Sequence, residues 1–308
     1  MILHHYPMSP FSEKIRLMFG YAGVDWHGVI NPEMPPRPAL DPLLGGYRRI
    51  PVAQAGADLF CDTRLISAEI AAMTNRPELD PANCDEAALG FSAGLEEEVF
   101  WACVASLPPL QVIKQLVFNI SVVGAFRFIK DRAGVAKRAN SKPMKPAEAK
   151  ALFARHLDEL EARLSGTDPY LFGDTPCHTD FAAYHTFWFQ RVVGELPMPE
   201  GIPSVSSWYA RLGEFGHGSN REIPAGEAFA AVASAAPRAL HDAQLQHERI
   251  GEQVAVQPSD YAMDATSGEL VGADDRRWVL ARDTEHGRVH IHFPVSGFEL
   301  VDPVSRAA

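Results

Sequence analysis

The first part of the chain combines short apolar runs with one clear helical period. Residues 2–6 form a partly apolar run that predicts a buried strand, and the chain then turns at residues 7–8. Apolar side chains next recur every three to four positions, the spacing of one helix face. These side chains are Phe11, Ile15, Met18, Phe19 and Ala22. Ser9 stands where an N-cap is expected and Pro10 at the first helical position, so we expect a strand followed directly by a helix.

Further strands and a hairpin follow this helix. Residues 26–30 can form a second strand, and the proline-rich stretch 31–42 must be a surface loop, because proline fits neither a helix interior nor a central strand. Residues 50–54 indicate a strand that begins near a proline, and residues 58–61 its hairpin partner. Asp62-Thr63 then supplies a helix cap. This order predicts a mixed sheet with helices packed against it.

The middle of the chain has a helical pattern, which we expect from residue 85 to about residue 236. The helix near Asp174 is aromatic on most sides, as is typical of the buried centre of a bundle. The basic, small-residue stretch 131–145 interrupts the pattern and is expected to be a loop or a frayed helix. The expected helices span residues 85–106, 110–130, 146–164, 174–193, 204–215 and 225–234.

The pattern changes again near residue 252, to short alternating runs separated by turn residues. Such alternation predicts a small antiparallel β module, reached through a linker that is helical in part. The expected strands lie near residues 254–256, 269–271, 278–281 and 289–293. The chain is therefore predicted to have an α+β fold in three parts, with an N-terminal domain (1–77), an all-helical domain (84–236) and a β module (252–300).

Composition and charge narrow the classes of function. The 308 residues carry a formal net charge of −11 and are 46% hydrophobic, as expected for a globular protein with real cores. An acidic chain disfavours non-specific binding to nucleic acid and an electrostatic membrane anchor. We find neither the pattern of a signal peptide nor the roughly 18 consecutive apolar residues of a membrane span, so we expect a cytoplasmic protein without membrane contact. Four cysteines far apart in the sequence predict reduced thiols, and they are Cys61, Cys84, Cys103 and Cys177.

Other polar clusters give weaker signals. His290 and His292 lie two apart on an expected strand, but no third ligand is evident, so we interpret them as exposed surface histidines rather than a metal site. His4 and His5 point to opposite faces of a strand and cannot share one ion. The acidic run 96–98 is interpreted as a solvated helix face. We therefore expect no metal.

Four short segments resemble motifs of one protein family. Residues 9–16 (SPFSEKIR) resemble a serine-type junction between a strand and a helix, and residues 49–52 (RIPV) a strand that begins with a cis proline. Residues 60–66 (FCDTRLI) resemble the segment that holds the γ-glutamyl end of glutathione, and residues 173–181 (GDTPCHTDF) a helix-capping motif. Together they resemble the glutathione S-transferase superfamily, in particular its zeta and tau-like branches, over residues 1–234.

The resemblance implies a fold and a general activity. It implies a thioredoxin-like N-terminal domain, with the order βαβ–ββα, followed by an all-α helical bundle. The β module lies outside the usual family pattern. The implied activity is transfer of glutathione to a small hydrophobic electrophile, in a homodimer with a detoxification role.

The resemblance also implies that Ser9 activates the thiol of glutathione. The thiolate is the nucleophile, and a free thiol with a pKa of about 8.5 is mostly protonated at neutral pH. A hydroxyl that donates to the sulfur, beside the N–H groups of a helix N-terminus, favours the anion. From the residues alone, Ser9 is more simply an N-cap. Ser12, one turn further on, and Tyr6, at the end of the first strand, are the alternatives for activation.

The resemblance also implies residues that bind the cysteinyl, glutamyl and glycyl parts of glutathione. A cis bond between Ile50 and Pro51 would turn the backbone of Ile50 toward the cysteinyl part of the peptide. Asp62 and Thr63 would bind the glutamyl amine and carboxylate, and a simple helix cap is the alternative interpretation. Arg49 would pair with the glycyl carboxylate, or else be solvated at a strand edge.

The second substrate is expected between the two domains. Phe100, Trp101 and Phe118 are candidates to line this pocket, and ordinary packing in the bundle core is the alternative interpretation. The helical capping motif departs from the family pattern, because Cys177 stands where serine or threonine is usual. A thiol is a poor cap acceptor, so we expect the helix to begin at Thr175 or to be slightly less stable.

Two other classes of function stay open at this stage. The chain could be a non-catalytic binding or scaffold protein with the same fold, because fold does not determine function and an added module often adds a partner. It could also be a glutathione-dependent isomerase or dehalogenase. Reductase chemistry is disfavoured because it usually requires cysteine where this chain has Ser9. The sequence does not identify the electrophile.

Overall fold

One sheet of ten strands runs through the protein in the computed structural model, which describes residues 1–139 and 144–303. The strands are β1 (Ile2–His5), β2 (Asp25–Ile30), β3 (Val52–Ala55), β4 (Asp58–Cys61), β5 (Ser219–Glu222), β6 (Gln253–Pro258), β7 (Thr266–Ala273), β8 (Arg277–Thr284), β9 (Gly287–Pro294) and β10 (Phe298–Val301). Their order across the sheet is β10-β6-β7-β8-β9-β4-β3-β1-β2-β5. The N-terminal strands therefore lie inside the sheet, and strands from the second half of the chain form both of its edges.

The N-terminal part has the predicted thioredoxin-like arrangement. Strand β1 pairs in parallel with β2, while β3 runs antiparallel to both β1 and β4. Its helices are α1 (Pro10–Ala22), the short α2 (Asp41–Leu44) and α3 (Thr63–Thr74). The proline-rich stretch is a loop, as predicted, as far as residue 40, but its last two residues, 41–42, begin α2. The buried Arg37 holds the loop by donating to the carbonyls of Pro32 (2.9 Å) and Glu33 (3.0 Å).

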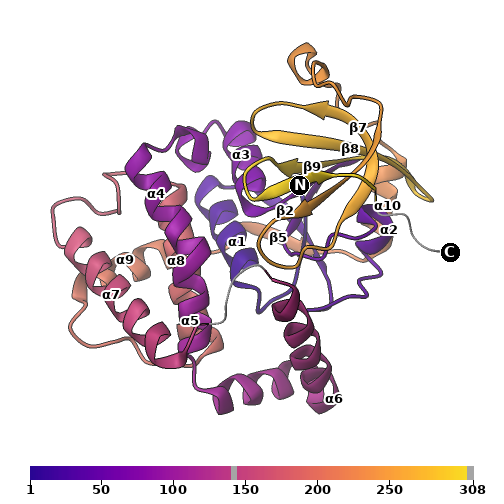
Figure 1. The fold of residues 1–308 in the computed structure, drawn as a ribbon. Helices are drawn as coiled ribbons and strands as arrows, with labels where there is room; N and C mark the ends of the chain where they lie inside the picture. The colour runs from indigo at the N-terminus through magenta and orange to yellow at the C-terminus, as the bar shows by residue number, and fades with distance from the viewer. Residues whose placement is uncertain (140–143, 304–308) are drawn as a thin grey trace.

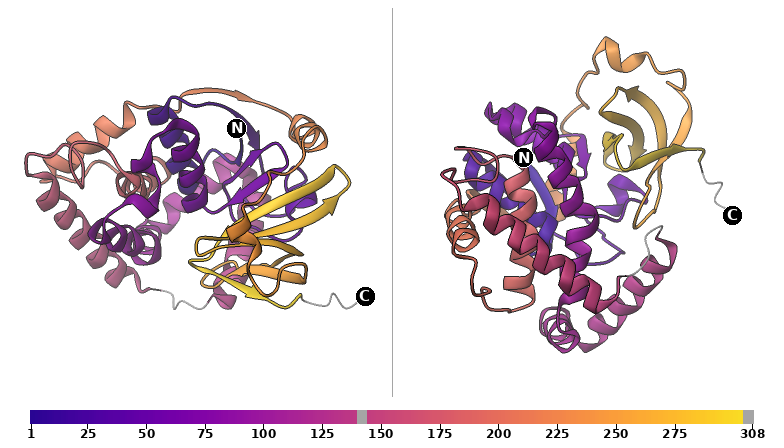
Figure 2. Two further views of the ribbon diagram at one scale, coloured as in Figure 1. Left: turned by 90° about the horizontal axis from the view of Figure 1, so that it is seen from above. Right: turned by 60° about the vertical axis from the view of Figure 1, so that its left-hand side comes forward.

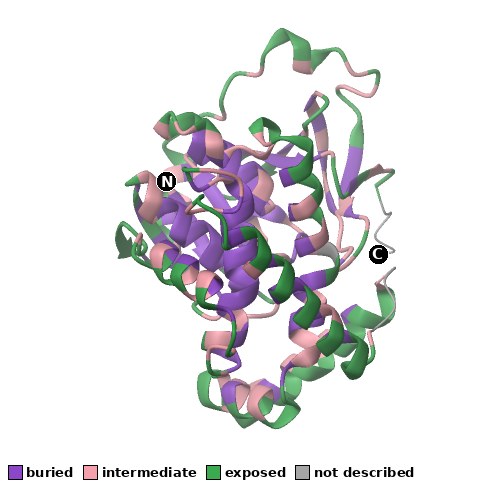
Figure 3. Ribbon diagram, turned by 90° about the vertical axis from the view of Figure 1, so that its left-hand side faces the viewer, coloured by how far each residue is buried: buried purple, intermediate pink, exposed green. Residues whose placement is uncertain are grey.

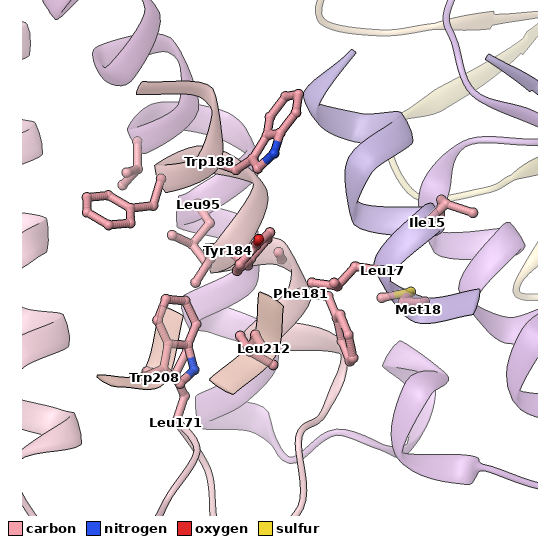
Figure 4. Close-up of a cluster of buried hydrophobic side chains, with 14 of the residues drawn as sticks. Ile15, Leu17, Met18, Leu95, Leu171, Phe181, Tyr184, Trp188, Trp208 and Leu212 are labelled. Carbon is pink, nitrogen blue, oxygen red and sulfur yellow. The ribbon is translucent and has the colours of Figure 1, made fainter. Parts of the chain in front are cut away.

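Helices from the middle of the chain form a bundle beside this domain, on the left in Figure 1. They are α4 (Glu86–Gly94), α5 (Phe100–Ser106), α7 (Pro146–Leu164), α8 (His178–Trp188) and α9 (Pro203–Gly213). Helix α6 (Pro109–Arg138) lies below this bundle in the same view, and α10 (Ala225–Ala233) lies on the other side, packed against β9 and the N-terminal part. The chain also forms π-helical turns at Leu95–Val99 and Phe189–Val193 and 3₁₀ turns at Pro77–Leu79, Pro81–Asn83 and Asp242–Leu245. Helix α8 is buried along its whole length, as its aromatic sequence predicts. Leu17 and Met18 of α1 point toward Phe181 of α8, so one core joins the two domains (Figure 4).

Helix α6 differs from its prediction in length and in exposure. It continues to Arg138, through most of the stretch expected to be a loop or frayed, and it is interrupted at Ser121 (φ 77°, ψ 165°). It is the one described helix that is long and apolar enough to cross a membrane, a criterion of length and composition alone that helices of soluble proteins also meet. Large apolar side chains such as Val122 and Phe126 are exposed on it (Figure 3).

Helix α8 begins at His178 with Cys177 as its N-cap, so the expectation of a start at Thr175 is wrong. The backbone N–H of Cys177 donates to Asp180 Oδ2 (3.0 Å), and the Cys177 side chain faces the N–H at the third helical position. The other carboxylate oxygen of Asp180 accepts from Trp208 Nε1 (2.8 Å). A buried carboxylate with several donors therefore supplies the capping that a thiol alone would supply poorly.

Strand β5 was not predicted, and it interrupts the part of the chain expected to be all helical. Residues 219–222 pair in parallel with β2, from Asp25 with Ser219 to Gly28 with Glu222. The sequence SNRE has no apolar alternation, and all four residues are exposed. Its strand form therefore depends on the open edge of β2 rather than on a buried face.

The C-terminal strands form the predicted antiparallel module, which is continuous with the N-terminal sheet. Strands β6 to β9 pair in sequence order, and β10 returns to pair with β6. Strand β9 then pairs in parallel with β4, so that His290 lies opposite Asp58 and His292 opposite Phe60. Figure 2 shows the orange and yellow C-terminal strands beside the indigo N-terminal part. The module thus shares backbone hydrogen bonds with the N-terminal domain.

A shared apolar core reinforces this junction. It contains Leu40, Leu43, Leu44, Tyr47, Ile50, Val52, Ala57, Leu59 and Cys61 from the N-terminal domain, with Val254, Val256, Leu270, Leu280, Val289, Ile291, Phe293 and Phe298 from the module. On the other face, His292 is buried, stacks on Phe60 (ring centroids 4.6 Å apart) and contacts Asp58 Oδ1 (2.9 Å). The interpretation of His292 as an exposed surface histidine is therefore wrong, because the pairing of β9 with β4 brings this face of the strand under helix α3.

Candidate active site

Ser9 lies in the turn between β1 and α1 and is the N-cap of α1. Its Oγ accepts a hydrogen bond from the backbone N–H of Ser12 (3.1 Å), and its own N–H donates to the carbonyl of Tyr6 (3.2 Å). Arg16 holds the same turn by donating to the carbonyl of Pro7 (3.0 Å). Ser9 is only 1% exposed. The hydroxyl therefore sits at the positive end of the helix dipole in a fixed and covered position.

The structure also places the two alternatives to Ser9. Burial raises the pKa of the Tyr6 phenol, against the smaller effects of Arg132, Arg37 and a hydrogen bond with Ser9. Tyr6 is therefore a neutral phenol beside Ser9 at neutral pH. Ser12 is buried, and its Oγ makes no hydrogen bond within the described part of the chain, while its backbone N–H caps toward Ser9. The side chains of Ser9 and Tyr6 are thus neighbours, and Ser12 is buried one helical turn after Ser9.

The strand that carries Pro51 and the turn that carries Asp62 lie at neighbouring positions in the domain. The bond between Ile50 and Pro51 is cis, immediately before β3. Asp62 is the N-cap of α3, where its side chain accepts from the N–H of Arg64 (2.9 Å) and its backbone is left-handed (φ 74°). Because β3 pairs with β1 on one side and with β4 on the other, these groups and Ser9 are positioned by one sheet.

Thr63 belongs to a buried polar cluster between the two domains. Lys14 Nζ, which is fully buried, lies 3.3 Å from Thr63 Oγ1, 2.7 Å from Glu96 Oε1 and 3.2 Å from His178 Nε2. Burial alone would raise the pKa of Glu96, but the charges of Lys14 and Arg64 outweigh it and hold that pKa well below its usual value. Glu96 is therefore a carboxylate with only 14% of its side chain exposed, held between two cations.

This position of Glu96 corrects the interpretation of its acidic run as a solvated face. Glu98 is exposed, as predicted, and the side chain of Glu97 lies outside the described part of the structure. Glu96 faces inward from the π-helical turn between α4 and α5, toward Lys14 and Arg64. The run therefore combines a surface residue with a residue of the interface between the domains.

Arg49 contacts the C-terminal module instead of solvent. Its guanidinium forms an ion pair with Asp260 and donates to the carbonyl of Tyr261. It also lies near the rings of Tyr261 (6.0 Å) and Phe298 (5.6 Å). A ligand carboxylate at Arg49 would therefore share this guanidinium with Asp260.

The three candidates for the second-substrate pocket separate into two places. Phe100 and Trp101 are in contact on α5 (ring centroids 5.4 Å apart), Phe11 of α1 packs on Phe100 (4.8 Å), and Trp101 packs on Tyr261 (4.7 Å). Phe118, on the first half of α6, is 87% exposed. The structure thus brings Phe100 and Trp101 toward the N-terminus of α1, and it leaves Phe118 at the surface.

A cavity of about 390 Å³ lies where the three parts of the chain meet. It borders Arg64 of α3, Glu96 and His178 of the helical domain, and Arg276 and Ser296 of the module. Arg276 is paired with Asp80 (2.6 Å), and Arg64 contacts Ser296 Oγ (3.0 Å). This opening adjoins the start of α3, where Asp62 and Thr63 lie.

Sequence reasoning missed the contribution of the module and of Lys14. Asp260 and Tyr261 follow a short strand in a segment outside the family resemblance, so no motif pointed to them. Arg132 lies in the stretch that was expected to be a loop or a frayed helix. A signal existed for Lys14, because it stands three residues after Phe11 and four before Met18, on the apolar face of the predicted helix.

Comparisons with known proteins agree with this geometry. The sequence model of the glutathione S-transferase N-terminal domain matches residues 3–78, and that of the C-terminal domain matches residues 138–211. No curated protein matches the chain.

Solved structures add a relative that extends over nearly the whole chain. A GST-like protein from Pseudomonas syringae is 32% identical, with a TM-score of 0.75, over 97% of this chain and 98% of that one. Glutathione S-transferases from Rhodospirillum rubrum (18% identical, TM-score 0.47) and Sinorhizobium meliloti (20%, 0.47) each match 69% of this chain and 87% of their own. The match to the Pseudomonas syringae protein therefore includes the C-terminal module. The chain belongs to the glutathione S-transferase family.

Proposed function

We propose that the protein is a glutathione transferase that conjugates glutathione to a small electrophile. The observation that carries the proposal is the position of Ser9 at the N-terminus of α1, on the same sheet as the cis Ile50–Pro51 bond and the Asp62–Thr63 turn. In the reaction, the sulfur of the thiolate forms a bond to an electrophilic carbon, whose leaving group departs with its electron pair. The thiol proton goes to solvent.

The hydrogen bonds of Ser9 support its role as the activating group. Its Oγ accepts from the N–H of Ser12 and has a second acceptor site for the Tyr6 phenol, so the hydroxyl proton can be donated to a ligand. A donor at a helix N-terminus stabilises the thiolate over the thiol and so lowers the pKa of the bound sulfur. Tyr6, a neutral phenol beside Ser9, is the alternative donor.

Other residues would hold the peptide. Lys14 Nζ lies within donating distance of Thr63 Oγ1, which leaves the Thr63 hydroxyl proton to donate to the glutamyl carboxylate. Asp62 would accept from the glutamyl ammonium, the backbone of Ile50 would pair with the cysteinyl part, and Arg49 would hold the glycyl carboxylate. Phe100 and Trp101 would lie beside the electrophile. A cytoplasmic homodimer is part of this proposal.

A non-catalytic binding protein is the second candidate, and two observations favour it. Ser9 is almost fully buried, and Arg49 is already paired with Asp260. A glutathione-dependent isomerase or dehalogenase would use the same glutathione site with a different second substrate. Activity measurements separate these candidates.

The first test is a thermal shift with millimolar glutathione. A ligand at about 100 times its dissociation constant stabilises the folded state by about 2.7 kcal/mol. Wild type should show this shift, and the absence of any shift would contradict the glutathione site.

The second test is conjugation of 1-chloro-2,4-dinitrobenzene by wild type, Ser9→Ala and the control Ser207→Ala, which changes an exposed serine. We expect Ser9→Ala to lose most of kcat and the control to lose none. Glutathione binding without any conjugation would favour the non-catalytic or isomerase candidates. Equal rates in wild type and Ser9→Ala would transfer the role to Tyr6 or Ser12.

A further inference from the structure

The connection between β6 and β7, residues 259–265, leaves the C-terminal module and lies against the N-terminal domain. Thr266 anchors its end, since Oγ1 donates to the carbonyl of Leu44 (3.0 Å) and accepts from the N–H of Tyr47 (3.1 Å). The contact is close, because a Cβ at Gly46 would stand 2.0 Å from the carbonyl oxygen of Ala265. The glycine at position 46 is therefore required for this approach.

Tyr261 is the residue of this connection that reaches the candidate active site. Its ring packs on Trp101 with centroids 4.7 Å apart, its hydroxyl accepts from Arg132 Nη1 (2.8 Å), and its carbonyl accepts from Arg49. One side chain of the module thus touches the helical domain, through α5 and α6, and its backbone touches the strand start at Arg49.

Aromatic contacts connect Tyr261 to the helix that Ser9 caps. Trp101, on which Tyr261 packs, is in contact with Phe100 (ring centroids 5.4 Å apart). Phe100 in turn packs on Phe11 in the first turn of α1 (4.8 Å), two residues after Ser9. The ring of Tyr261 therefore belongs to an aromatic cluster that extends to the N-terminus of α1, where the thiolate is proposed to lie.

Ion pairs and a constrained backbone hold the β6–β7 connection in one position. Arg48 is paired with Asp131 of α6 (2.7 Å) and with Asp264 (3.7 Å), so it links helix and connection. Ala262 is buried and has a left-handed backbone (φ 51°), a conformation that a non-glycine residue keeps only where its surroundings impose it. These contacts fix the orientation of the neighbouring Tyr261.

We propose that Tyr261 is a specificity-determining residue for the second substrate, and that the C-terminal module is by this residue part of the active site. The inference rests on the proposed transferase function. Trp101 and Tyr261 together present an aromatic surface, which favours an aromatic electrophile whose ring packs against it. Arg132, held beside this surface, suits an electrophile with an acceptor substituent such as a nitro or carboxylate group.

An aromatic electrophile with nitro groups is a suitable probe, and its reaction with glutathione is a substitution. With 1-chloro-2,4-dinitrobenzene, the glutathione sulfur forms a bond to the ring carbon that carries chlorine, and the carbon–chlorine bond breaks with its electron pair on chloride. The thiol proton passes to solvent. The product, S-(2,4-dinitrophenyl)glutathione, contains the peptide and the ring in one molecule.

The test uses the full chain with Tyr261→Ala and with Tyr261→Phe, which keeps the ring. We expect Tyr261→Ala to raise the KM for 1-chloro-2,4-dinitrobenzene about three- to tenfold, because an aromatic contact of this kind is lost. The KM for glutathione should stay within about twofold, and Tyr261→Phe should restore the value for the electrophile. Glu285→Ala, at an exposed turn of the module, is the control and should behave as wild type.

A binding measurement separates failure of the inference from failure of the proposed function. Quenching of tryptophan fluorescence reports the affinities for glutathione and for S-(2,4-dinitrophenyl)glutathione. In Tyr261→Ala, the ratio of the affinity for the conjugate to the affinity for glutathione should fall about three- to tenfold. If wild type binds both and this ratio is unchanged in Tyr261→Ala, the inference alone is refuted. If wild type binds neither, the proposed function fails and the inference falls with it.

Discussion

Lys14 Nζ lies 2.7 Å from Glu96 Oε1, and this pair joins α1 to the turn between α4 and α5. The same Nζ reaches Thr63, which begins α3. A single buried cation thus connects the helix that carries Ser9, the turn proposed to hold the glutamyl carboxylate, and the helical domain. Rigid placement of these groups relative to one another depends on it.

Lys14→Met should therefore destabilise the protein strongly. Removal of one partner from a buried ion pair costs about 3–5 kcal/mol, and we expect the lower end of this range because Glu96 keeps Arg64 as a second partner (3.4 Å). Urea denaturation should show a loss of this order, and the double variant Lys14→Met/Glu96→Gln should recover part of it because the charge left behind is removed. The control is Glu98→Gln, an exposed neighbour on the same turn. A Lys14→Met variant as stable as wild type would contradict the structural role of the pair.

Stability should also fall between about pH 6.5 and pH 4, in part because of His156. Burial lowers the pKa of His156 from 6.5 to about 4. Between these pH values the unfolded chain binds a proton at His156 that the folded state does not bind. The contribution of neutral His156 to the free energy of unfolding is therefore complete above pH 6.5 and is lost as the pH falls to about 4. The difference of about 2.5 units corresponds to about 3 kcal/mol.

Urea midpoints at pH 7.5, 6 and 5 measure this dependence. His156→Leu should flatten the curve in this range, whereas His241→Leu, at an exposed position, should leave its slope as in wild type. A curve with the same slope in His156→Leu would show that other groups carry the dependence. His4, whose pKa burial also lowers to about 4, is the next to examine.

Asp260→Asn should tighten glutathione binding if Arg49 holds the glycyl carboxylate. In the structure the Asp260 carboxylate is paired with the Arg49 guanidinium, so a ligand carboxylate must compete with it. Exposed ion pairs of this kind contribute up to about 1 kcal/mol to stability. We expect the dissociation constant by calorimetry to fall about two- to fivefold. Asp302→Asn, which removes an exposed partner of Arg249, is the matched control. Unchanged affinity would remove Arg49 from the proposed glutathione site.

Deletion of residues 237–308 should abolish cooperative folding of the N-terminal domain. The deletion exposes the hydrogen-bonding edge of β4 and the apolar residues Val52, Leu59 and Cys61, which the module buries. We expect an aggregated product without a sharp thermal transition, while a chain that ends at Pro303 should unfold as wild type does. A soluble, cooperative fragment of residues 1–236 would show that the module is dispensable for the fold.

The sequence predicted the two family domains because their signals are local. The apolar spacing after Ser9, the proline at position 51 and the cap at Asp62 each occupy a few neighbouring residues, and the fold follows from their order. The buried state of α8 was also visible in its aromatic residues. Such patterns need no knowledge of distant partners.

The remaining features depend on contacts between distant segments, which local patterns do not contain. β9 alternates apolar and polar residues, so His292 seemed exposed until the pairing with β4 covered it. Glu96 faces the interior because Lys14 lies opposite, although its neighbours in sequence are acidic. β5 has a wholly polar sequence and becomes a strand only against the edge of β2. The partners of Arg49 likewise come from the β6–β7 connection.

The pairing of β9 with β4 has a consequence for folding during synthesis on the ribosome. Domains that are synthesised first usually fold first. Here the N-terminal domain emerges with one strand edge open and with half of an apolar core, and both are completed by β9 and its neighbours near the end of the chain. The nascent N-terminal domain must therefore wait, with β4 uncovered, until β9 (Gly287–Pro294) has been synthesised, and we expect it to depend on chaperones during that interval.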